Sequence, residues 1–404
     1  MKMGEIFVLD DPTGDGKKAR FLNYANGLFQ IPYAMLAEKD ALYVLHRRNL
    51  TRITDTDNDG KADRFERVLH LQHGIAETYD YAYGLVRDKQ GRFVFSYAPH
   101  ANHHLPGSGA ALRLESKDQP REIAFGFRNP LGWTVGNDGE IFFTDNQGEW
   151  VATNKLCHLQ EGKFYGYPNP AQKQHALKPF AKTSLWIPYD WARSINGVTF
   201  NNTGGKFGPF EGQFFLAELM FGGAIIRAQL EKINGQYQGA CFPFWGKGLL
   251  GPVVLAFDPQ GRLFVGSITE PGWMAQPDRG ALYRIDFTGK VPFEMKSIHV
   301  RPSGFRIVFT KAVDRKTASA VASFQIRHHR YEYTGAYGSP ELDRSTLAIK
   351  SVRIDRDGCS VDLVTAPLLK DRVYMITAGG VLSVEGEQLV HSTGAYTLNE
   401  IPKE

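Results

Sequence analysis

The sequence predicts an all-β protein, and three observations lead to that fold class. Short apolar strands recur along the first 290 residues, joined by turns that contain Gly, Asp or Asn. The chain holds 42 glycines and 27 phenylalanines, which suits many short strands and tight turns. Helical periodicity is almost absent.

The strands come in pairs that repeat at a regular interval. A first pair is expected at 5–10 and 19–24, and five pairs of inner strands follow at 33–37 with 41–45, 84–87 with 92–97, 132–135 with 140–144, 197–201 with 213–217, and 252–258 with 262–267. The turn residues before the second strand of each inner pair are 50, 48, 73 and 49 residues apart. Four short strands in a period near 50 residues are typical of a β-propeller. We therefore expect residues 1–290 to form five clear blades and a partial one, six in all.

Two irregularities interrupt this repeat. The long interval contains an insertion at about residues 151–191, rich in Pro, Lys and aromatic side chains. Loops of that length without their own strands usually take part in function or cover a domain. Six blades would also need two inner strands before the first pair. Their absence fits either closure with five and a half blades or a chain cut from a longer protein.

The pattern changes after Lys290. Alternating apolar and polar segments lie at 297–310, 323–329, 346–354, 360–365, 373–378 and 391–398. About a hundred residues with this pattern predict an immunoglobulin-like β-sandwich over residues 291–404. We find no catalytic constellation in its sequence.

Composition narrows the function classes. The net charge of +4 and the lack of a Lys/Arg run argue against a nucleic-acid surface. No apolar run approaches the roughly 20 residues that span a bilayer, and the N-terminus lacks a signal-peptide core. Either the protein is cytoplasmic or a targeting segment is missing from this chain. Cys157, Cys241 and Cys359 are expected to be buried thiols, and one disulfide among them is the alternative. Without a Cys-x-x-Cys-His motif, we expect no covalent haem in this chain.

A calcium motif is the sharpest local pattern. It places oxygen ligands at the first, third, fifth, ninth and twelfth positions, a carbonyl at the seventh and Gly60 at the sixth; the ligands are Asp55, Asp57, Asp59, Lys61, Asp63 and Glu66. Strands are expected on both sides, so the motif predicts a Ca²⁺ loop in a hairpin, with a structural role. The alternative is a solvated acidic turn.

Strand entrances in a propeller converge on its central funnel, where ligands bind. Pro130 fixes its own φ and lacks a donor, which holds the preceding polar pair at such an entrance. The candidates at four entrances are His73, Tyr79, Asp80, Tyr81, Arg128, Asn129, Arg193, Asn196 and Lys247. Two Arg, one Lys and several amides would suit a planar, multiply anionic ligand. The alternative is that Arg128 forms a buried structural bridge with Asp145 or Glu149.

Several of these motifs carry a family resemblance. Gly-Phe-Arg-Asn-Pro-Leu-Gly at 126–132, followed by Gly-Glu-Ile-Phe-Phe-Thr-Asp at 139–145, resembles a blade of the soluble quinoprotein glucose and sorbosone dehydrogenases. The stretches 207–218 and 258–265 are similar to two further blades of that family. The likeness spans roughly residues 5–290 and is strongest to the large secreted propeller proteins of planctomycetes, labelled membrane-bound or sorbosone dehydrogenases, which often carry a haem-binding cytochrome domain.

The resemblance implies a chemistry. Pyrroloquinoline quinone (PQQ) would lie in the funnel with a calcium ion, and a histidine would take the hydroxyl proton of a sugar or alcohol as hydride moves to the quinone. It implies Arg128, Asn129, Arg193, Asn196 and Lys247 as cofactor contacts, a periplasmic or secreted location, and a cytochrome c-type electron acceptor.

The sequence departs from that family at the residue expected to act as the catalytic base. The position of the family's histidine falls near Asp80, and the nearest histidine is His73. Either residue would have to serve as the base, and an Asp can do so when its environment tunes its pKa. Two other readings stay open: a non-catalytic propeller that binds polysaccharide or a partner, and a calcium-dependent polysaccharide hydrolase or lyase that uses funnel carboxylates.

Overall fold

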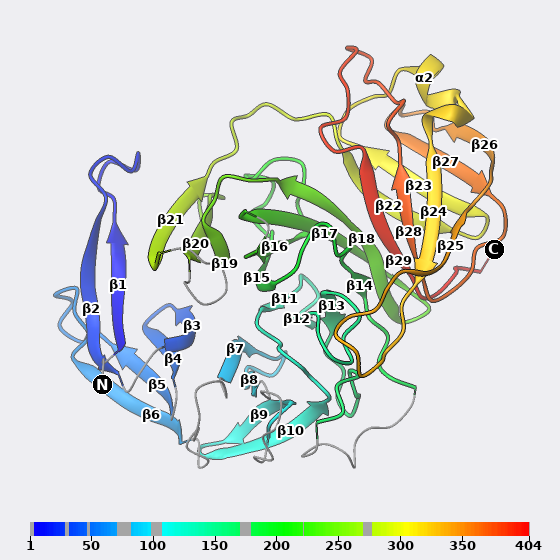
Figure 1. The fold of residues 1–404 in the computed structure, drawn as a ribbon. Helices are drawn as coiled ribbons and strands as arrows, with labels where there is room; N and C mark the ends of the chain where they lie inside the picture. Colours follow the sequence, from blue (N-terminus) through cyan, green and yellow to red (C-terminus); the bar gives the residue numbers. More distant parts are fainter. Residues whose placement is uncertain are drawn as a thin grey trace. The chain divides into compact units, whose positions relative to one another are not determined.

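A computed structural model of the chain describes residues 4–28, 32–46, 49–70, 82–97, 107–169, 179–220, 222–269 and 277–403. It divides into two compact units. The first unit consists of Met1–Pro130 and Gln160–Pro179, and the second of Leu131–Leu159 and Phe180–Glu404. Strands, labelled in Figure 1, are the main regular secondary structure of both units.

The first unit contains a hairpin and two four-stranded antiparallel sheets. The hairpin is β1 (Gly4–Asp10) and β2 (Arg20–Leu28). The sheets are β3 (Pro32–Glu38), β4 (Ala41–His46), β5 (Asn49–Thr54), β6 (Arg64–His70), and β7 (Ala82–Arg87), β8 (Phe93–Tyr97), β9 (Ala110–Ser116), β10 (Gln119–Phe125). In each sheet the strands pair in chain order, which is the meander of a propeller blade. Leu45, Leu85 and Phe95 belong to one buried cluster that joins the two sheets.

The second unit continues the same plan. Its blades are β11 (Trp133–Val135), β12 (Ile141–Asp145), β13 (Lys155–His158), β14 (Leu185–Trp186); β15 (Ile195–Phe200), β16 (Phe214–Glu218), β17 (Ala224–Ile233), β18 (Gln236–Trp245); and the three-stranded β19 (Gly251–Phe257), β20 (Leu263–Thr269), β21 (Arg279–Ile285). All five predicted inner pairs are therefore confirmed as antiparallel neighbours.

The predicted insertion differs from expectation. Instead of a loop without strands, residues 151–191 contain β13 and β14, the two outer strands of the third blade. The two strands are only four and two residues long, and periodicity over so short a span is too weak to reveal a strand.

The C-terminal part of the second unit is a two-sheet sandwich (Figure 1). One sheet is β22 (Met295–Arg301), β23 (Gly304–Phe309), β27 (Ser360–Thr365) and β26 (Ile349–Ile354); the other holds β29 (Thr393–Leu398), β28 (Arg372–Thr377), β24 (Gln325–Arg330) and β25 (Leu342–Thr346). Ile307, Leu363, Tyr374 and Tyr396 meet in the core between them. The predicted strand at 297–310 is instead a hairpin, β22–β23, because Pro302 cannot donate to a ladder.

Short helical segments lie between β23 and β24. The α-helix α2 (Arg315–Ser319) begins at Asp314, whose side chain accepts a hydrogen bond from the Thr317 amide. A 3-10 turn, η2 (Val321–Ser323), follows it. Among the described residues, no helix is long and apolar enough to cross a membrane.

The sandwich shares a sheet with the fourth blade. β18 pairs with β29 through Gly239 with Thr397, Ala240 with Tyr396 and Cys241 with Ala395, giving one eight-stranded sheet. Backbone hydrogen bonds therefore join the C-terminal region to the blade. The boundary at 290/291 and the immunoglobulin-like character of the sandwich remain predictions.

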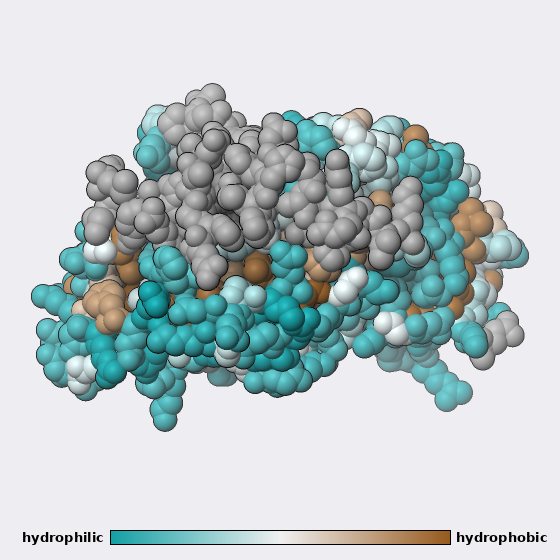
Figure 2. Space-filling view, turned by 90° about the horizontal axis from the view of Figure 1, so that it is seen from below, coloured by the Kyte–Doolittle hydropathy of each residue, from teal (hydrophilic) through white to brown (hydrophobic). Residues whose placement is uncertain are grey.

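Side-chain character follows this architecture. Hydrophilic residues dominate the described part of the face in Figure 2, with smaller hydrophobic areas between them. The largest fully buried side chains include several of Phe and Tyr, such as Phe95, Phe142 and Phe242. These aromatic side chains thus fill the hydrophobic core between the sheets.

Candidate functional site

Polar side chains gather where the third and fourth blades meet in the second unit. The Asn146 amide donates to Ser194 Oγ at 3.3 Å, and the Asn196 amide donates to the Ser194 carbonyl at 3.2 Å. Thr144 Oγ1 donates to the Asn196 carbonyl at 3.2 Å. Asn146 follows β12 and Asn196 lies near the start of β15, so these contacts tie two adjacent strand ends together. We call Asn146, Arg193, Ser194, Asn196 and Glu218 the tip cluster.

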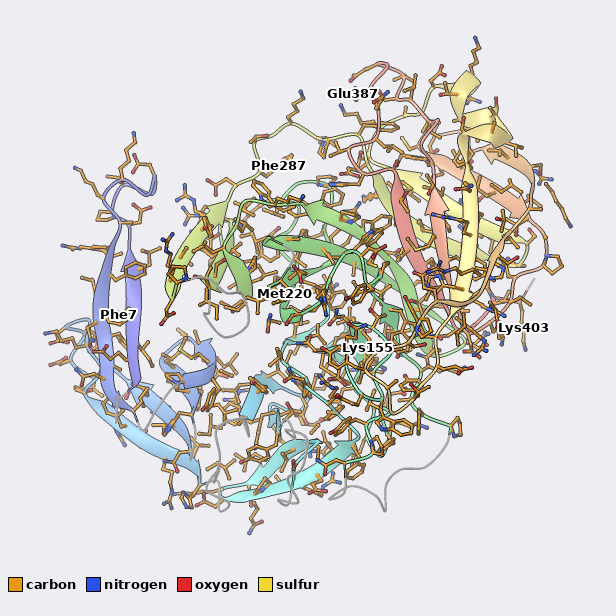
Figure 3. All side chains as sticks on the ribbon, in the orientation of Figure 1. Phe7, Lys155, Met220, Phe287, Glu387 and Lys403 are labelled. Atoms are coloured by element: carbon orange, nitrogen blue, oxygen red, sulfur yellow. The ribbon has the colours of Figure 1, made fainter. Side chains whose placement is uncertain are left out.

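A buried carboxylate fixes the backbone of this cluster. Glu218 Oε1 accepts hydrogen bonds from the amides of Arg193 at 3.1 Å, Ser194 at 3.3 Å and Met220 at 2.9 Å. Glu218 is fully buried. Met220, the third of these donors, is labelled in Figure 3. Three N–H donors stabilise an ionised carboxylate. Glu218 therefore positions the segment from which Arg193 extends.

Arg193 provides the cation of the cluster. Its side chain is exposed, and its guanidinium lies 5.1 Å from the centre of the Tyr189 ring. Stacking on an aromatic ring limits the rotamers of an arginine while leaving its donors available. Such a guanidinium can bind a carboxylate through two hydrogen bonds.

Asn146 supplies a buried acceptor. Its side chain is only 5% exposed, and no described group hydrogen-bonds its Oδ1. An unsatisfied buried acceptor costs about 1–3 kcal/mol, which a donor such as a hydroxyl would offset. The cluster thus offers a cation, amide donors and an acceptor that needs a hydroxyl or N–H.

The other predicted contacts are placed as follows. Lys247 is exposed in the turn after β18, at the end of the fourth blade where Gly248 hydrogen-bonds Gly222. Arg128 and Asn129 are half-buried and belong to the first unit, after β10. Tyr79, Tyr81 and both predicted base residues, His73 and Asp80, lie outside the described residues.

A buried ion pair lies directly behind the tip cluster. Lys155 Nζ is 3.8 Å from an Asp145 carboxylate oxygen, and both side chains are fully buried (Figure 3 labels Lys155). Nζ also lies 5.4 Å from the centre of the Tyr333 ring and 5.9 Å from that of Trp186. Burial alone would lower the pKa of Lys155, but Tyr333, Cys157 and Asp145 outweigh it, and the net direction is upward. Burial raises the pKa of the Cys157 thiol to about 11, so this thiol is not a nucleophile at neutral pH.

The predicted calcium loop joins β5 to β6 in the first unit. The carboxylate oxygens of Asp55, Asp57 and Asp59 lie within 4.8 Å of one another. The Gly60 amide donates to Asp55 at 2.9 Å and the Lys61 amide to Asp59 at 2.7 Å, which aims the remaining lone pairs inward. Gly60 has a φ of +89°, as a sharp turn at the sixth position requires.

The two later acids of the motif have other partners. Asp63 accepts from the amide and hydroxyl of Thr56 at 3.0 and 2.5 Å. Glu66 pairs with Arg52 at 2.8 Å and Arg64 at 2.7 Å. The structure therefore brings together the first three predicted ligands and keeps the last two in protein contacts.

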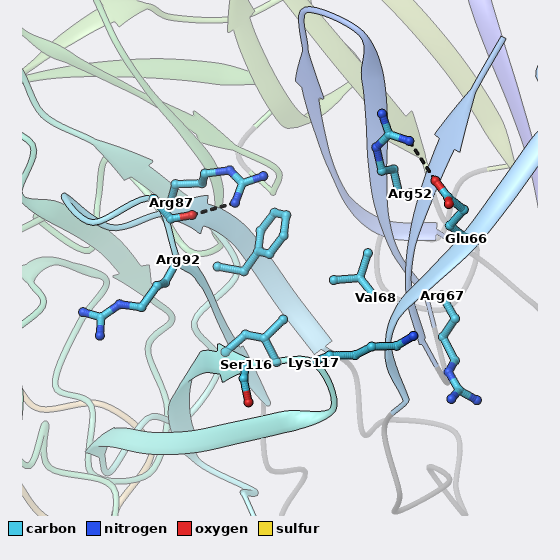
Figure 4. A pocket seen from close by; sticks show the side chains of 11 residues that line it. Arg52, Glu66, Arg67, Val68, Arg87, Arg92, Ser116 and Lys117 are labelled. Atoms are coloured by element: carbon cyan, nitrogen blue, oxygen red, sulfur yellow. Dashed lines mark hydrogen bonds and ion pairs between the residues drawn. The ribbon is translucent and has the colours of Figure 1, made fainter. Parts of the chain in front are cut away.

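A pocket of about 440 Å³ lies between the two blades of the first unit (Figure 4). It is lined by five cations: Arg52, Arg67, Arg87, Arg92 and Lys117. Each of the four arginines has an acidic partner. Arg52 pairs with Glu66 and Asp40, and Arg67 pairs with Asp118. Arg87 pairs with Glu38, and Arg92 pairs with Asp88 and Glu115. These ion pairs neutralise the four arginines; of the five lining cations, Lys117 is the one for which no acidic partner is described, so the lining does not concentrate positive charge.

Sequence reasoning missed Ser194 and the acceptor role of Asn146. Ser194 lies between the predicted contacts Arg193 and Asn196, which is the one indication the sequence offers. No sequence motif marks its hydroxyl, and only the packing of the third blade against the fourth brings it to Asn146.

Comparison with known proteins agrees with the fold. No known family pattern and no curated protein sequence matches the chain. A solved structure described as a glucose dehydrogenase is similar over 70% of this chain and 91% of its own, with 17% identity and a TM-score of 0.52.

Two further structures are similar at lower scores. The PQQ-bound aldose sugar dehydrogenase of Streptomyces coelicolor has 14% identity and a TM-score of 0.48, covering 70% of this chain and 93% of its own. The apo form of the soluble aldose sugar dehydrogenase of Escherichia coli has 14% identity and a TM-score of 0.47, covering 70% and 91%. The likeness to the glucose dehydrogenase shows the fold alone. The chain has the β-propeller fold seen in sugar dehydrogenases, which confirms the predicted fold class; the number of blades remains a prediction.

Proposed function

We propose that this propeller is a quinoprotein-type sugar dehydrogenase that holds pyrroloquinoline quinone and its sugar at the tip cluster. The observation that carries the proposal is the pairing of an exposed, ring-stacked Arg193 with a buried Asn146 acceptor that lacks a described partner. A planar quinone with several carboxylates needs guanidinium and amide donors, and a sugar hydroxyl needs an acceptor. The residues present fit both requirements.

Each residue has a defined task in this proposal. Arg193 binds a carboxylate of the cofactor, and the Asn196 amide orients the cofactor. Asn146 Oδ1 accepts a hydrogen bond from a sugar hydroxyl, while Glu218 holds the backbone that carries Arg193. A quinone held by these residues would supply the hydride acceptor for oxidation of the sugar. Arg128, Asn129 and Lys247 are proposed as further cofactor contacts, and Asp80 or His73 as the group that takes the hydroxyl proton.

The test is a dye-linked assay after reconstitution. The protein is mixed with pyrroloquinoline quinone and Ca²⁺, and dye reduction is followed with aldoses and simple alcohols. The proposal expects sugar-dependent reduction that is lost without added quinone. Absence of reduction with every sugar would contradict it, and quinone-free sugar binding would then favour a non-catalytic role. A cytochrome c-type acceptor and a periplasmic or secreted location belong to the same proposal.

We also propose that Asp55, Asp57 and Asp59 bind a structural Ca²⁺ ion. Three carboxylates within 4.8 Å repel one another, and a hard cation relieves this repulsion. A ligand at a hundred times its Kd stabilises a folded protein by about 2.7 kcal/mol. We expect Ca²⁺ to raise the melting temperature of the wild type by several degrees, and EDTA to reverse the rise.

The Asp57→Asn variant is expected to lose most of this calcium-dependent rise. Asp40→Asn is the control, since Asp40 is an exposed acid in the turn between β3 and β4, outside the loop. Calorimetry with and without Ca²⁺ measures the melting temperatures of both variants. An equal rise in wild type and Asp57→Asn would contradict the site.

A further inference from the structure

A loop of the sandwich lies against the third blade beside the tip cluster. The loop, residues 331–341 between β24 and β25, contacts the segment 147–152 that follows β12 (Figure 1). The Trp150 amide donates to the Thr334 carbonyl at 2.8 Å, the Gly338 amide to Gly148 at 3.0 Å, and the Ser339 amide to Ala152 at 2.9 Å. Three backbone hydrogen bonds fix the loop in one position.

The two segments fit together through special backbone conformations. Gly338 has a φ of +75°, and a Cβ there would lie 2.6 Å from Gln147 Nε2. Trp150 has a φ of +61°, which is unusual for a bulky residue. Such strain costs about 1–3 kcal/mol and is found mainly where function requires a particular geometry.

The backbone bridge between the two segments sets Tyr337 opposite Glu149. Tyr337 is 57% exposed and forms an antiparallel bridge with Glu149, which is also exposed. The half-buried Trp150 indole passes close to Gly335, where an added Cβ would lie 3.6 Å from the ring. A large exposed aromatic on a fixed loop loses little conformational entropy on binding a ligand.

These groups adjoin the tip cluster along the chain. The Gln147 amide donates to Asn154 Oδ1 at 3.2 Å, and the Asn154 amide donates to the Ala192 carbonyl at 2.9 Å. Ala192 precedes Arg193, so one hydrogen-bonded path connects the loop contact to the cluster. Glu149 is three residues after Asn146, so their Cα atoms are at most about 11 Å apart, which an oligosaccharide of two or three units spans.

We propose that Trp150, Tyr337 and Glu149 form a platform that binds a second sugar unit, so that the ligand is an oligosaccharide. The inference rests on the proposed function, in which the tip cluster binds a sugar. Aromatic faces cover the C–H faces of a sugar ring, and a carboxylate accepts hydrogen bonds from its hydroxyls. A monosaccharide at the tip cluster would not use these groups.

Calorimetric titration with glucose and with malto- and cello-oligosaccharides, in the absence of quinone, tests the platform. We expect the affinity of the wild type to rise with chain length. Tyr337→Ala should weaken binding of the longer ligands by about fivefold to tenfold and leave glucose binding unchanged. Tyr337→Phe, which keeps the ring, should retain most of the affinity, and Glu149→Gln should weaken it.

Leu369→Ala is the control, because Leu369 is a similarly exposed apolar residue, at 48%, elsewhere in the sandwich. Affinity that does not depend on chain length, equal affinities for wild type and Tyr337→Ala, or no binding of any oligosaccharide would each overturn the platform. Because no quinone is added, this titration tests oligosaccharide binding independently of whether the protein is a dehydrogenase.

Discussion

Replacing Lys155 with methionine is expected to lower the free energy of unfolding by about 3–5 kcal/mol. Lys155 and Asp145 are both fully buried, with Nζ 3.8 Å from the carboxylate. The substitution removes a buried cation that faces the buried Asp145 carboxylate. Chemical denaturation followed by tryptophan fluorescence measures the loss.

Two comparisons separate this effect from lost packing. Lys182→Met removes an ion pair with Asp371 whose side chains are 42% and 60% exposed, and should change stability by at most about 1 kcal/mol. Adding Asp145→Asn to Lys155→Met removes the buried negative charge as well and should recover part of the loss. If Lys155→Met were no worse than Lys182→Met, the buried pair would not support the third blade.

The Gly132→Ala variant is expected to lose about 1–3 kcal/mol of stability and to weaken ligand binding at the tip cluster. A Cβ at Gly132 would lie 2.2 Å from the Asn196 carbonyl oxygen and 2.8 Å from Thr144 Oγ1. The Gly132 amide also donates to that hydroxyl at 2.9 Å. An added methyl therefore forces the third and fourth blades apart where Asn196 is held.

Gly246→Ala provides the matched control. Gly246 has an ordinary φ and nothing within 4 Å of an added Cβ, so its replacement should change stability by less than about 0.5 kcal/mol. Thermal unfolding of both variants, together with sugar titration, gives the comparison. Equal behaviour of the two variants would show that the blade contact at Gly132 tolerates expansion.

Much of the fold is readable from local pattern. Four of the five inner pairs were predictable because each is an apolar strand pair across a short turn, as at Asp258–Gly261 between β19 and β20. The fourth pair, β15 and β16, has a longer connection and was predictable from its two apolar runs. The cluster of Asp55, Asp57 and Asp59 was predictable for the same reason, since these three acids lie within one turn. Glu66 does not join the cluster because it lies on β6 and pairs with Arg52 of the neighbouring strand β5.

What could not be predicted depends on contacts between distant segments. β14 has two residues and acquires its strand geometry from pairing with β13. The joining of β18 to β29 links residues more than 150 positions apart, and no local pattern encodes it. Lys155 looks like a surface residue in sequence and is buried because Tyr333 of the sandwich loop lies against it. Ser194 entered the site only through Asn146.

The most direct measurement of the central claim is a quinone titration of wild type and Arg193→Gln in the presence of Ca²⁺, followed by the absorbance of the quinone. Arg327→Gln is the control, since Arg327 is an exposed arginine on β24 of the sandwich. The account predicts saturable binding that Arg193→Gln weakens by about tenfold or more and Arg327→Gln leaves unchanged. No saturable binding, or equal affinity in Arg193→Gln and wild type, would contradict a quinone site at the tip cluster.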